Sequence, residues 1–194
     1  RVREHDVYSE IFGYNITSQD LDSKNIDGII LSGGPSSVYD TNAPKLDKNI
    51  LEMGLPILGI CYGLHLMIKA DEGNVLHKGQ GEYGFSTIQP KIDSLLLKGI
   101  SKQSKVWMSH GDEIEKLGNS YKIIANSSNN IIAAIEHDNL PLYGVQFHPE
   151  VVHTVDGAQM LHNFLFKISN CKKTWTATNF ISEAVKSINK IVGE

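Results

Sequence analysis

The chain has 194 residues, of which 41% are hydrophobic and 21% are charged. This length and composition predict one soluble globular domain with a full-sized hydrophobic core. The net charge of −4 gives no reason to expect a nucleic acid or an anionic membrane as a partner. No apolar run approaches the roughly 18 residues that a membrane span requires.

Targeting and redox signals point to the cytoplasm. The first residues, RVREHDVYSEIF, lack the apolar stretch of a signal peptide. The two cysteines, Cys61 and Cys171, are far apart in the sequence. Two cysteines in a chain of this length do not make a disulfide framework, so we expect a reducing, cytoplasmic location.

Strands and helices alternate along the chain. Apolar runs bounded by turn residues predict strands at 28–33, 55–60, 105–109, 121–127, 131–137 and 142–147. Several of these runs are nearly continuous, which is typical of strands buried on both faces. Apolar residues at helical spacing predict helices at 43–54 and 156–169. We therefore predict an α/β fold with a mostly parallel central sheet flanked by helices, to which residues 83–136 add antiparallel strands.

The tail carries apolar residues at helical spacing from Phe180 to Val192. Thr178 or Asn179 is the predicted N-cap of this helix, which follows a turn-like stretch. It could pack on this domain or on something beyond the chain end. We accordingly divide the chain into a domain over residues 1–171 and a linker with a helix over residues 172–194.

The stretch LPILGICYGLHLMIKA, residues 55–70, has the spacing of a nucleophile elbow with Cys61 in place of the usual serine. In that motif the nucleophile sits on a sharp turn between a strand and a helix, and small residues two places before and after it relieve crowding. A thiol at a helix N-terminus gains thiolate character. The alternative is a cysteine buried beside glycines that serve only packing.

A cysteine nucleophile requires a base, and the base requires an orienting group. The segment YGVQFHPEVVH places His148 after an apolar strand and Glu150 two residues later. Pro149 prevents a helix from continuing through His148, so the imidazole is expected in a loop at a strand end, where active-site residues of α/β sheets gather. His148, Glu150 and His153 could also suggest a metal site, but Pro149 disrupts the helix that would aim them at one ion.

A glycine turn follows the strand at 28–33. Glycines in Ser32-Gly33-Gly34-Pro35 let backbone N–H groups approach a ligand closely. One of these groups, together with the N–H of Tyr62, would stabilise a tetrahedral oxyanion. A simple tight turn is the alternative. Four further histidines are expected to be ordinary surface or core residues: His5, His77, His137 and His162.

Taken together, SGGP, GICYG and FHPE resemble, in this order, the signatures of the class I glutamine amidotransferases. The segments ILSGGPSSVYDTNAP, EYGFSTI, VWMSHGDEIEKL and LYGVQFHPEVVHTVDGAQMLHNFLFKISNC are similar to the glutaminase domains of GMP synthetases more than to those of anthranilate, carbamoyl-phosphate or CTP synthetases. The resemblance implies a flavodoxin-like fold that hydrolyses glutamine to glutamate and ammonia.

The resemblance also implies residue roles. Cys61 would attack the side-chain amide, His148 would transfer the proton to ammonia, and Glu150 would orient His148. The oxyanion N–H groups would come from Gly34 and Tyr62. The family holds the glutamine α-amino and α-carboxylate groups near residues that here are Gly33, Glu82, Tyr83, Ser109, His110 and Asp112. Alternatively, Glu82 could be a solvated residue and Asp112 the cap of a turn.

Three departures from the family pattern stand out. Where the family has a substrate-contacting glutamine four residues after the nucleophile, this chain has His65; we predict weaker glutamine binding or a stronger pH dependence. The family's first strand precedes a segment like RVREHD, so we expect a fragment that lacks this strand. No segment resembles the SGGxDS pyrophosphate-binding loop of the ATP-using half.

The implied partners follow from that last departure. The domain itself would need no cofactor and no metal. ATP and Mg²⁺ would belong to an ATP-pyrophosphatase domain, fused or separate, which would use the ammonia to convert XMP to GMP within a homodimeric enzyme. Other possibilities are a glutaminase of another synthetase, a γ-glutamyl hydrolase or cysteine peptidase on the same scaffold, and a degraded domain kept only as an interaction surface.

Overall fold

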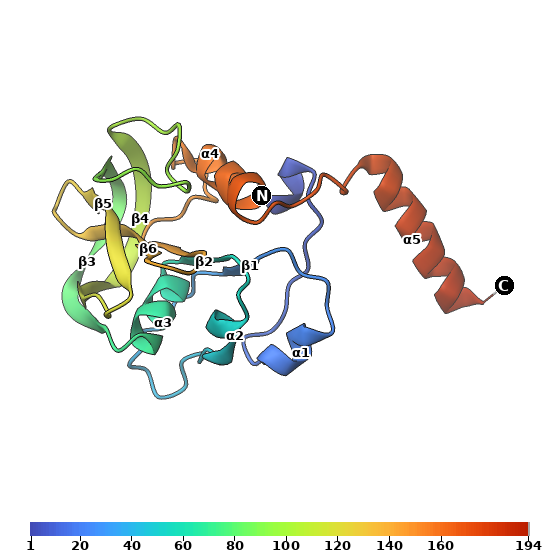
Figure 1. The fold of residues 1–194 in the computed structure, drawn as a ribbon, viewed down its shortest axis with the longest axis horizontal. Helices are drawn as coiled ribbons and strands as arrows, with labels where there is room; N and C mark the ends of the chain where they lie inside the picture. Colours follow the sequence, from blue (N-terminus) through green and yellow to red (C-terminus); the bar gives the residue numbers. More distant parts are fainter. Residues whose placement is uncertain (194) are drawn as a thin grey trace.

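The computed structural model describes residues 1–193, except for the side chains of residues 78–80, 177, 183, 184 and 187. In this part of the chain, seven strands form one mixed sheet in the order β1-β2-β7-β6-β5-β3-β4 (Figure 1). The strands are β1 (Ile29–Leu31), β2 (Ile57–Ile60), β3 (Asn74–Pro90), β4 (Ser104–Lys116), β5 (Tyr121–Ser127), β6 (Ile132–His137) and β7 (Leu142–Val145).

The expectation of a mostly parallel sheet is wrong. Only β1, β2 and β7 pair in parallel, whereas the pairings of β7 with β6, β6 with β5, β5 with β3 and β3 with β4 are antiparallel. The physical reason is that β3 to β7 follow one another without a helix between them. Parallel neighbours need a long crossover connection, usually a helix. The added antiparallel strands were expected, but they form the larger part of the sheet.

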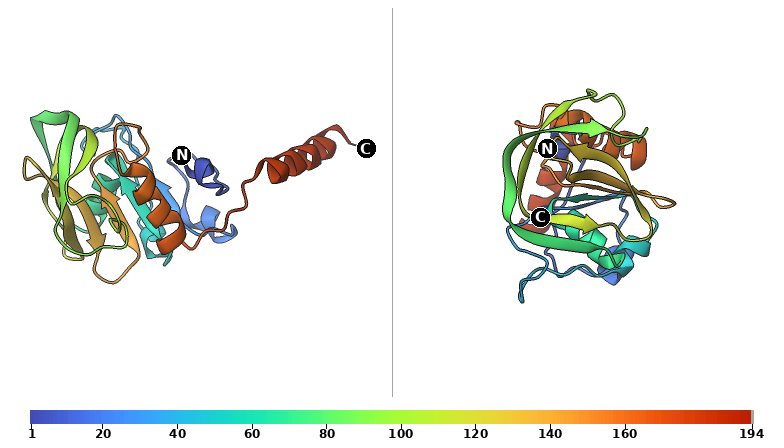
Figure 2. Two further views of the ribbon diagram at one scale, coloured as in Figure 1. Left: turned by 90° about the horizontal axis from the view of Figure 1, so that it is seen from above. Right: turned by 90° about the vertical axis from the view of Figure 1, so that its left-hand side faces the viewer.

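Helices cover both faces of the parallel strands (Figures 1 and 2). The helical elements are η1 (Val2–His5), α1 (Ser18–Asp22), α2 (Asn49–Glu52), α3 (Tyr62–Ala70), α4 (Gly157–His162), the π-helical η2 (Asn163–Ile168) and α5 (Ala177–Val192). Apolar residues of α1, α2 and α3 form one buried cluster, and those of α4 and η2 form the other. Along β2, Ile57 belongs to the first cluster and Leu58 to the second, which explains the continuous apolar run of this strand.

Two predicted helices differ in detail. The helix expected at 43–54 is formed only over α2, because Pro44 disfavours helical geometry for Ala43 and the Asp47 carboxylate accepts the N–H of Asn49 at 3.1 Å at the start of the helix. The Asp47 carboxylate also accepts hydrogen bonds from the backbone N–H and the hydroxyl of Ser18, at 2.8 Å each. The helix expected at 156–169 is present as α4 followed by η2.

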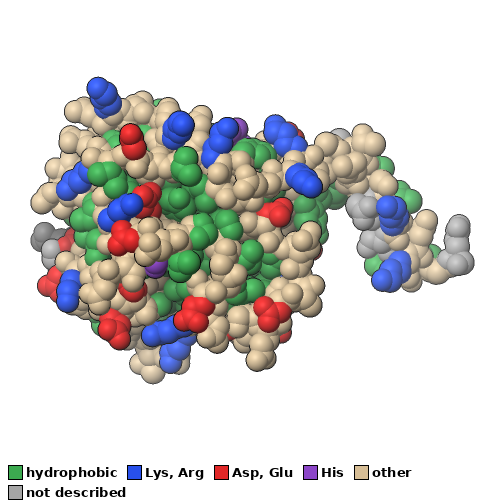
Figure 3. Space-filling view, viewed as in Figure 1, with side chains coloured by type: hydrophobic (Ala, Val, Ile, Leu, Met, Phe, Trp, Pro, Cys, Tyr) green, Lys and Arg blue, Asp and Glu red, His purple; other side chains and the backbone are tan. Residues whose placement is uncertain are grey.

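Helix α5 extends away from the rest of the chain (Figures 1 and 2). Its N-cap is Thr176, whose Oγ1 accepts a hydrogen bond from the backbone N–H of Asn179 at 3.2 Å, so the predicted caps at Thr178 or Asn179 are wrong. Hydrophobic side chains lie on its surface (Figure 3), with Ile191 82% exposed. No helix among the described residues is long and apolar enough to cross a membrane.

Two expectations about the chain's organisation stay predictions. One is the division into residues 1–171 and 172–194. The other is the expectation that the chain is a fragment that lacks the family's first strand.

Candidate active site

Cys61 occupies the turn between β2 and α3. Its φ of 49° and ψ of −104° lie in a region that an L-residue rarely adopts, and such strain costs roughly 1–3 kcal/mol. Hydrogen bonds on both sides hold this conformation: the Cys61 N–H donates to the carbonyl of Val145 at 2.8 Å, and the Cys61 carbonyl accepts from the His65 N–H at 3.1 Å. The strand, turn and helix that the elbow motif requires are therefore present.

The glycines on either side of Cys61 are required by close backbone approach. A Cβ on Gly59 would lie 2.8 Å from the backbone nitrogen of Leu64, and one on Gly63 would lie 2.7 Å from the carbonyl carbon of Leu31. Real Cβ atoms do not approach backbone atoms this closely without displacing them. Helix α3 therefore packs against β1 and β2 only because these two positions lack a side chain, which fixes Cys61 at the ends of the strands.

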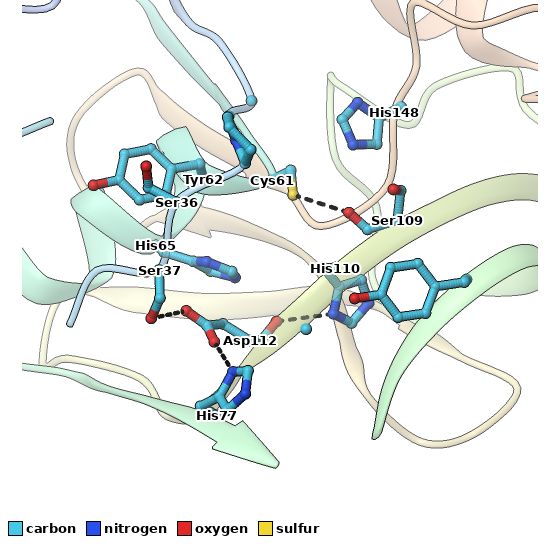
Figure 4. Close-up of a pocket in the computed structure, with 15 residues that line it drawn as sticks. Ser36, Ser37, Cys61, Tyr62, His65, His77, Ser109, His110, Asp112 and His148 are labelled. Atoms are coloured by element: carbon cyan, nitrogen blue, oxygen red, sulfur yellow. Dashed lines mark hydrogen bonds and ion pairs between the residues drawn. The ribbon is translucent and has the colours of Figure 1, made fainter. Parts of the chain in front are cut away.

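His148 lies in the loop after β7, as predicted, and its imidazole faces Cys61 across the cavity (Figure 4). Its backbone N–H donates to the carbonyl of Trp107 at 3.0 Å. The Nδ1 atom lies 2.7 Å from Oε1 of Glu150. A carboxylate at this distance holds Nδ1 protonated and fixes the ring, so Nε2 is left for the reacting partner.

The electrostatics of this group favour a protonated imidazole. Hydrogen bonding to Cys61 and then to Glu150 raises the pKa of His148 to about 10, against the opposing effect of burial. Burial alone would raise the pKa of Glu150, but the hydrogen bond from His148 holds it below its ordinary value. An imidazolium beside a thiol is the environment that activates cysteine nucleophiles.

The third residue of the possible metal motif is used differently. The ring of His153 packs on Trp107, with centroids 4.6 Å apart, and on Phe85, with centroids 5.6 Å apart. Among the residues whose side chains are described, no group of three or more His, Cys, Asp or Glu residues could hold a metal ion.

A cavity of about 530 Å³ opens in front of Cys61 (Figure 4). Most of the predicted site residues line it: Gly33, Gly34, Cys61, Tyr62, His65, Tyr83, Ser109, His110, Asp112 and His148. Glu150 lies behind His148. Glu82 contacts His110 instead, with 3.6 Å between Oε2 and the imidazole Nε2, and accepts a hydrogen bond from Asn129. The volume falls within the range typical of small-molecule sites.

Comparison with known proteins decides the family. The family model described as "Glutamine amidotransferase class-I" matches residues 1–168. The chain belongs to the class I glutamine amidotransferases. The solved structure of a putative GMP synthase subunit from Thermoplasma acidophilum is 30% identical with a TM-score of 0.75, and the match covers 87% of this chain and 84% of that one.

The curated relatives show which members of this family the chain is similar to. The "GMP synthase [glutamine-hydrolyzing]" proteins of Thermosynechococcus vestitus and Crocosphaera subtropica are 44% and 45% identical to this amidotransferase over 100% and 97% of its chain. The chain spans only 36% and 35% of their lengths. The predicted similarity to the glutaminase part of GMP synthetases is confirmed.

One buried carboxylate, that of Asp112, lies in the wall opposite the elbow of this amidotransferase. Asp112, on β4, accepts a hydrogen bond from the Ser37 hydroxyl at 2.6 Å, and its other oxygen lies 2.7 Å from Nδ1 of His77. Burial alone would raise the pKa of Asp112, but Ser37 and His77 hold it below its ordinary value. Asp112 therefore presents a negative charge to the cavity.

Sequence reasoning missed several of these residues. His77, expected to be ordinary, lines the cavity because it is the cross-strand partner of Asp112. Thr154 stabilises the loop that contains His148. Its Oγ1 donates to the His148 carbonyl at 2.6 Å and accepts from the Trp107 N–H at 3.0 Å. No local signal in the sequence points to either residue. For Gln146, which contacts Cys61 and His65, the one hint is a polar residue inside an apolar strand.

Proposed function

We propose that this amidotransferase is the glutaminase part of a glutamine-hydrolysing GMP synthase. The observation that carries the proposal is the arrangement of Cys61, His148 and Glu150. A strained cysteine at a helix N-terminus faces an imidazole, and a carboxylate 2.7 Å from that imidazole orients it. The cavity in front of them has room for an amino acid. This arrangement supports acyl transfer through a covalent thioester.

In the proposed reaction, the Cys61 thiolate attacks the side-chain amide carbon of glutamine and forms a C–S bond. The protonated His148 gives its proton to the amide nitrogen as the C–N bond breaks, and ammonia leaves. Neutral His148 then takes a proton from water, whose oxygen attacks the glutamyl thioester. The C–S bond breaks with the Cys61 thiolate as the leaving group, and glutamate is released. The thiolate and the protonated His148 then form the starting ion pair again. Glu150 keeps the imidazole oriented through both steps.

The tetrahedral intermediates carry negative charge on the former amide oxygen. We assign its stabilisation to the backbone N–H groups of Gly34, which follows β1, and of Tyr62, which begins α3 beside it. Each such donor is typically worth about 3 kcal/mol in the transition state. The N-terminus of α3 adds a favourable dipole at the same position.

The rest of the cavity is suited to the amino-acid end of glutamine. The buried, negatively charged Asp112 is the proposed acceptor for the α-ammonium group. The remaining polar positions are proposed to bind the α-carboxylate and to close the pocket: Gly33, Tyr83, Ser109 and His110. Glu82 is proposed to act through His110. His65 is proposed to stand near the substrate, in the place of the family glutamine.

The partner is proposed from the relatives. Because the chain spans 36% of the length of the Thermosynechococcus GMP synthase, we propose that a synthetase domain, fused or separate, uses the ammonia. That domain would bind ATP and Mg²⁺ and convert XMP to GMP in a homodimeric enzyme. A reducing cytoplasm is the proposed location, because Cys61 and Cys171 are both free thiols.

The test measures glutamate release from glutamine by this chain and by Cys61→Ala. Each protein is assayed alone and with the separately produced synthetase domain of a relative, ATP, Mg²⁺ and XMP. We expect Cys61-dependent hydrolysis that rises when the partner and nucleotides are present. Hydrolysis of γ-glutamyl peptides in preference to glutamine would favour a γ-glutamyl hydrolase. No Cys61-dependent hydrolysis in any mixture would contradict the proposal.

A further inference from the structure

Gln146 is a fully buried amide that reaches the reacting sulfur. It follows β7, is 0% exposed, and its backbone N–H donates to the carbonyl of Ala133 at 2.9 Å. Its side-chain Nε2 donates to Sγ of Cys61 at 3.8 Å, and its Oε1 lies 2.8 Å from Nε2 of His65. The amide thus links the histidine to the cysteine in the interior, behind the cavity.

The two ends of this amide are not interchangeable. His65 is buried, and burial lowers its pKa although the hydrogen bond to Gln146 opposes this, so the ring is neutral at pH 7 and carries one N–H. The side-chain oxygen of Gln146 can only accept a hydrogen bond, so its contact at 2.8 Å assigns the single N–H of the ring to Nε2. Because a buried amide needs all its partners, the NH₂ group is left to point at Cys61.

The sulfur has a second polar neighbour that distinguishes its two protonation states. The Ser109 carbonyl oxygen lies 3.7 Å from Sγ (Figure 4). A carbonyl can only accept a hydrogen bond, so it is a partner for the neutral S–H alone. The Gln146 N–H can only donate, and such a bond becomes stronger when the acceptor is charged. Gln146 therefore favours the thiolate over the thiol.

We propose that Gln146 is a further catalytic residue, which donates its amide N–H to the Cys61 thiolate, and that His65 is the positioning residue that fixes the direction of this amide. The inference rests on the proposed function for its catalytic meaning. It gives His65 a role that needs no contact with glutamine. The charged and titratable groups facing the pair are His148 beside Cys61, and Asp112 and His110 beside His65.

The decisive measurement is the rate at which iodoacetamide alkylates Cys61, followed by mass spectrometry of the Cys61 peptide so that Cys171 does not interfere. No glutamine is present. We expect Gln146→Leu and His65→Leu to move the pH midpoint of the reaction upward by about one unit, because one charge-assisted hydrogen bond is lost. At pH values below the midpoint of the unmodified protein, this shift should slow alkylation about tenfold. His65→Gln keeps a donor at this position and should restore most of the rate.

Controls separate this effect from a loss of fold. Gln159→Leu, at an exposed position on α4, should alkylate like the unmodified protein, and thermal melts should show that each variant is folded. If Gln146→Leu does not fold, the test depends on the loss of alkylation rate in His65→Leu and its recovery in the His65→Gln variant. Alkylation rates and pH midpoints that stay within twofold of the unmodified protein in both leucine variants would overturn the inference.

Glutaminase kinetics separate the inference from the proposed function. A lower kcat at unchanged KM in His65→Leu is expected for a residue that acts through Gln146. A higher KM with normal alkylation would make His65 a substrate contact and overturn its positioning role. An unmodified protein that shows the expected alkylation pattern but hydrolyses no glutamine would contradict the proposed function alone.

Discussion

The parallel and antiparallel halves of the sheet contribute differently to the site. The parallel strands β2 and β7 deliver Cys61 and His148 from their carboxyl ends, and β1 leads into the Gly33-Gly34 turn. The antiparallel hairpin of β3 and β4 supplies the opposite wall, including Asp112. The proposed reacting groups are therefore positioned by the ends of strands, whereas the wall is positioned by the pairing of two strands.

This difference has a structural cause. Cys61 is fixed by the short bond between its N–H and the Val145 carbonyl of the neighbouring strand, so its position follows from the strand itself. In the hairpin, the register shifts between the pairs that contain His77 and Glu82. Such a bulge decides which side chains face the cavity. Changes in the parallel half should therefore affect chemistry and fold, and changes in the hairpin should affect binding.

The largest expected effect is on the chemical step. In Glu150→Gln, the amide no longer holds the imidazole with Nδ1 protonated, and the pKa of His148 loses one of the interactions that raise it. We expect kcat for glutamine hydrolysis to fall by about 10²- to 10³-fold with little change in KM. Steady-state kinetics measure this, with Glu52→Gln, at an exposed position of α2, as the matched control. A kcat within threefold of the unmodified protein would rule out the orienting role.

The next effect is on stability. Gly63→Ala places a Cβ against the backbone of β1, and we expect it to lower the free energy of unfolding by about 3 kcal/mol. The melting temperature should fall by roughly 6–12 °C for a chain of this size. The control in the hairpin is Gly111→Ala, whose Cβ would meet Tyr83 at 3.4 Å and His77 at 3.5 Å. It should cost less than about 1 kcal/mol. Equal losses in both variants would remove the contrast between the halves.

A smaller effect is expected at the hairpin wall. Asp112→Asn keeps the shape of the side chain but removes its charge, so the proposed contact with the substrate α-ammonium weakens. We expect KM for glutamine to rise about tenfold, equivalent to about 1.4 kcal/mol, while kcat changes much less. Asp138→Asn, in the exposed loop after β6, is the control. If kcat fell while KM stayed constant, Asp112 would not belong to the binding wall.

The same contrast describes what the sequence could predict. The turn at Cys61 and the loop that contains His148 lie where the sequence predicts them, because local features decide their positions: glycines beside Cys61, an apolar strand before it, and a proline after His148. The fold class was right in outline, but the dominance of antiparallel pairs was not foreseen. Strand β3 has few apolar residues, so its pattern is too weak to predict its full length.

Family resemblance predicts which residues form the wall opposite Cys61, but it does not predict their contacts. Asp112 was a candidate, yet its partners Ser37 and His77 come from distant segments, and only the β3–β4 register brings His77 opposite to it. The same holds for Thr154 and Gln146, whose roles depend on contacts with Trp107, Cys61 and His65. Periodicity and spacing report which residues are buried, but they do not report which buried polar groups meet.

The smallest effects concern stability against pH, and they have opposite signs in the two halves. Hydrogen bonds to Cys61 and Glu150 raise the pKa of His148 to about 10, so it stabilises the folded state fully below the unfolded value of about 6.5. This contribution is lost as the pH rises from 6.5 through 10. Burial lowers the pKa of His110. Below pH 6.5 the unfolded chain therefore binds a proton at this residue more readily than the folded chain does. The folded state loses stability as the pH decreases.

Urea unfolding of the unmodified protein, His148→Gln and His110→Gln at pH 5.5, 7.5 and 9.5 tests both signs. The stability deficit of His148→Gln should be greatest at pH 5.5 and shrink by about 1 kcal/mol by pH 9.5, a figure reduced for solvent screening. His110→Gln should gain stability relative to the unmodified protein between pH 7.5 and 5.5, because it removes a group whose pKa is lowered by burial. Some acid sensitivity remains, because His65 is also buried with a lowered pKa. The difference in free energy of unfolding from the unmodified protein should change with pH in opposite directions for the two variants. A change in the same direction for both would contradict the opposite pKa shifts of His148 and His110.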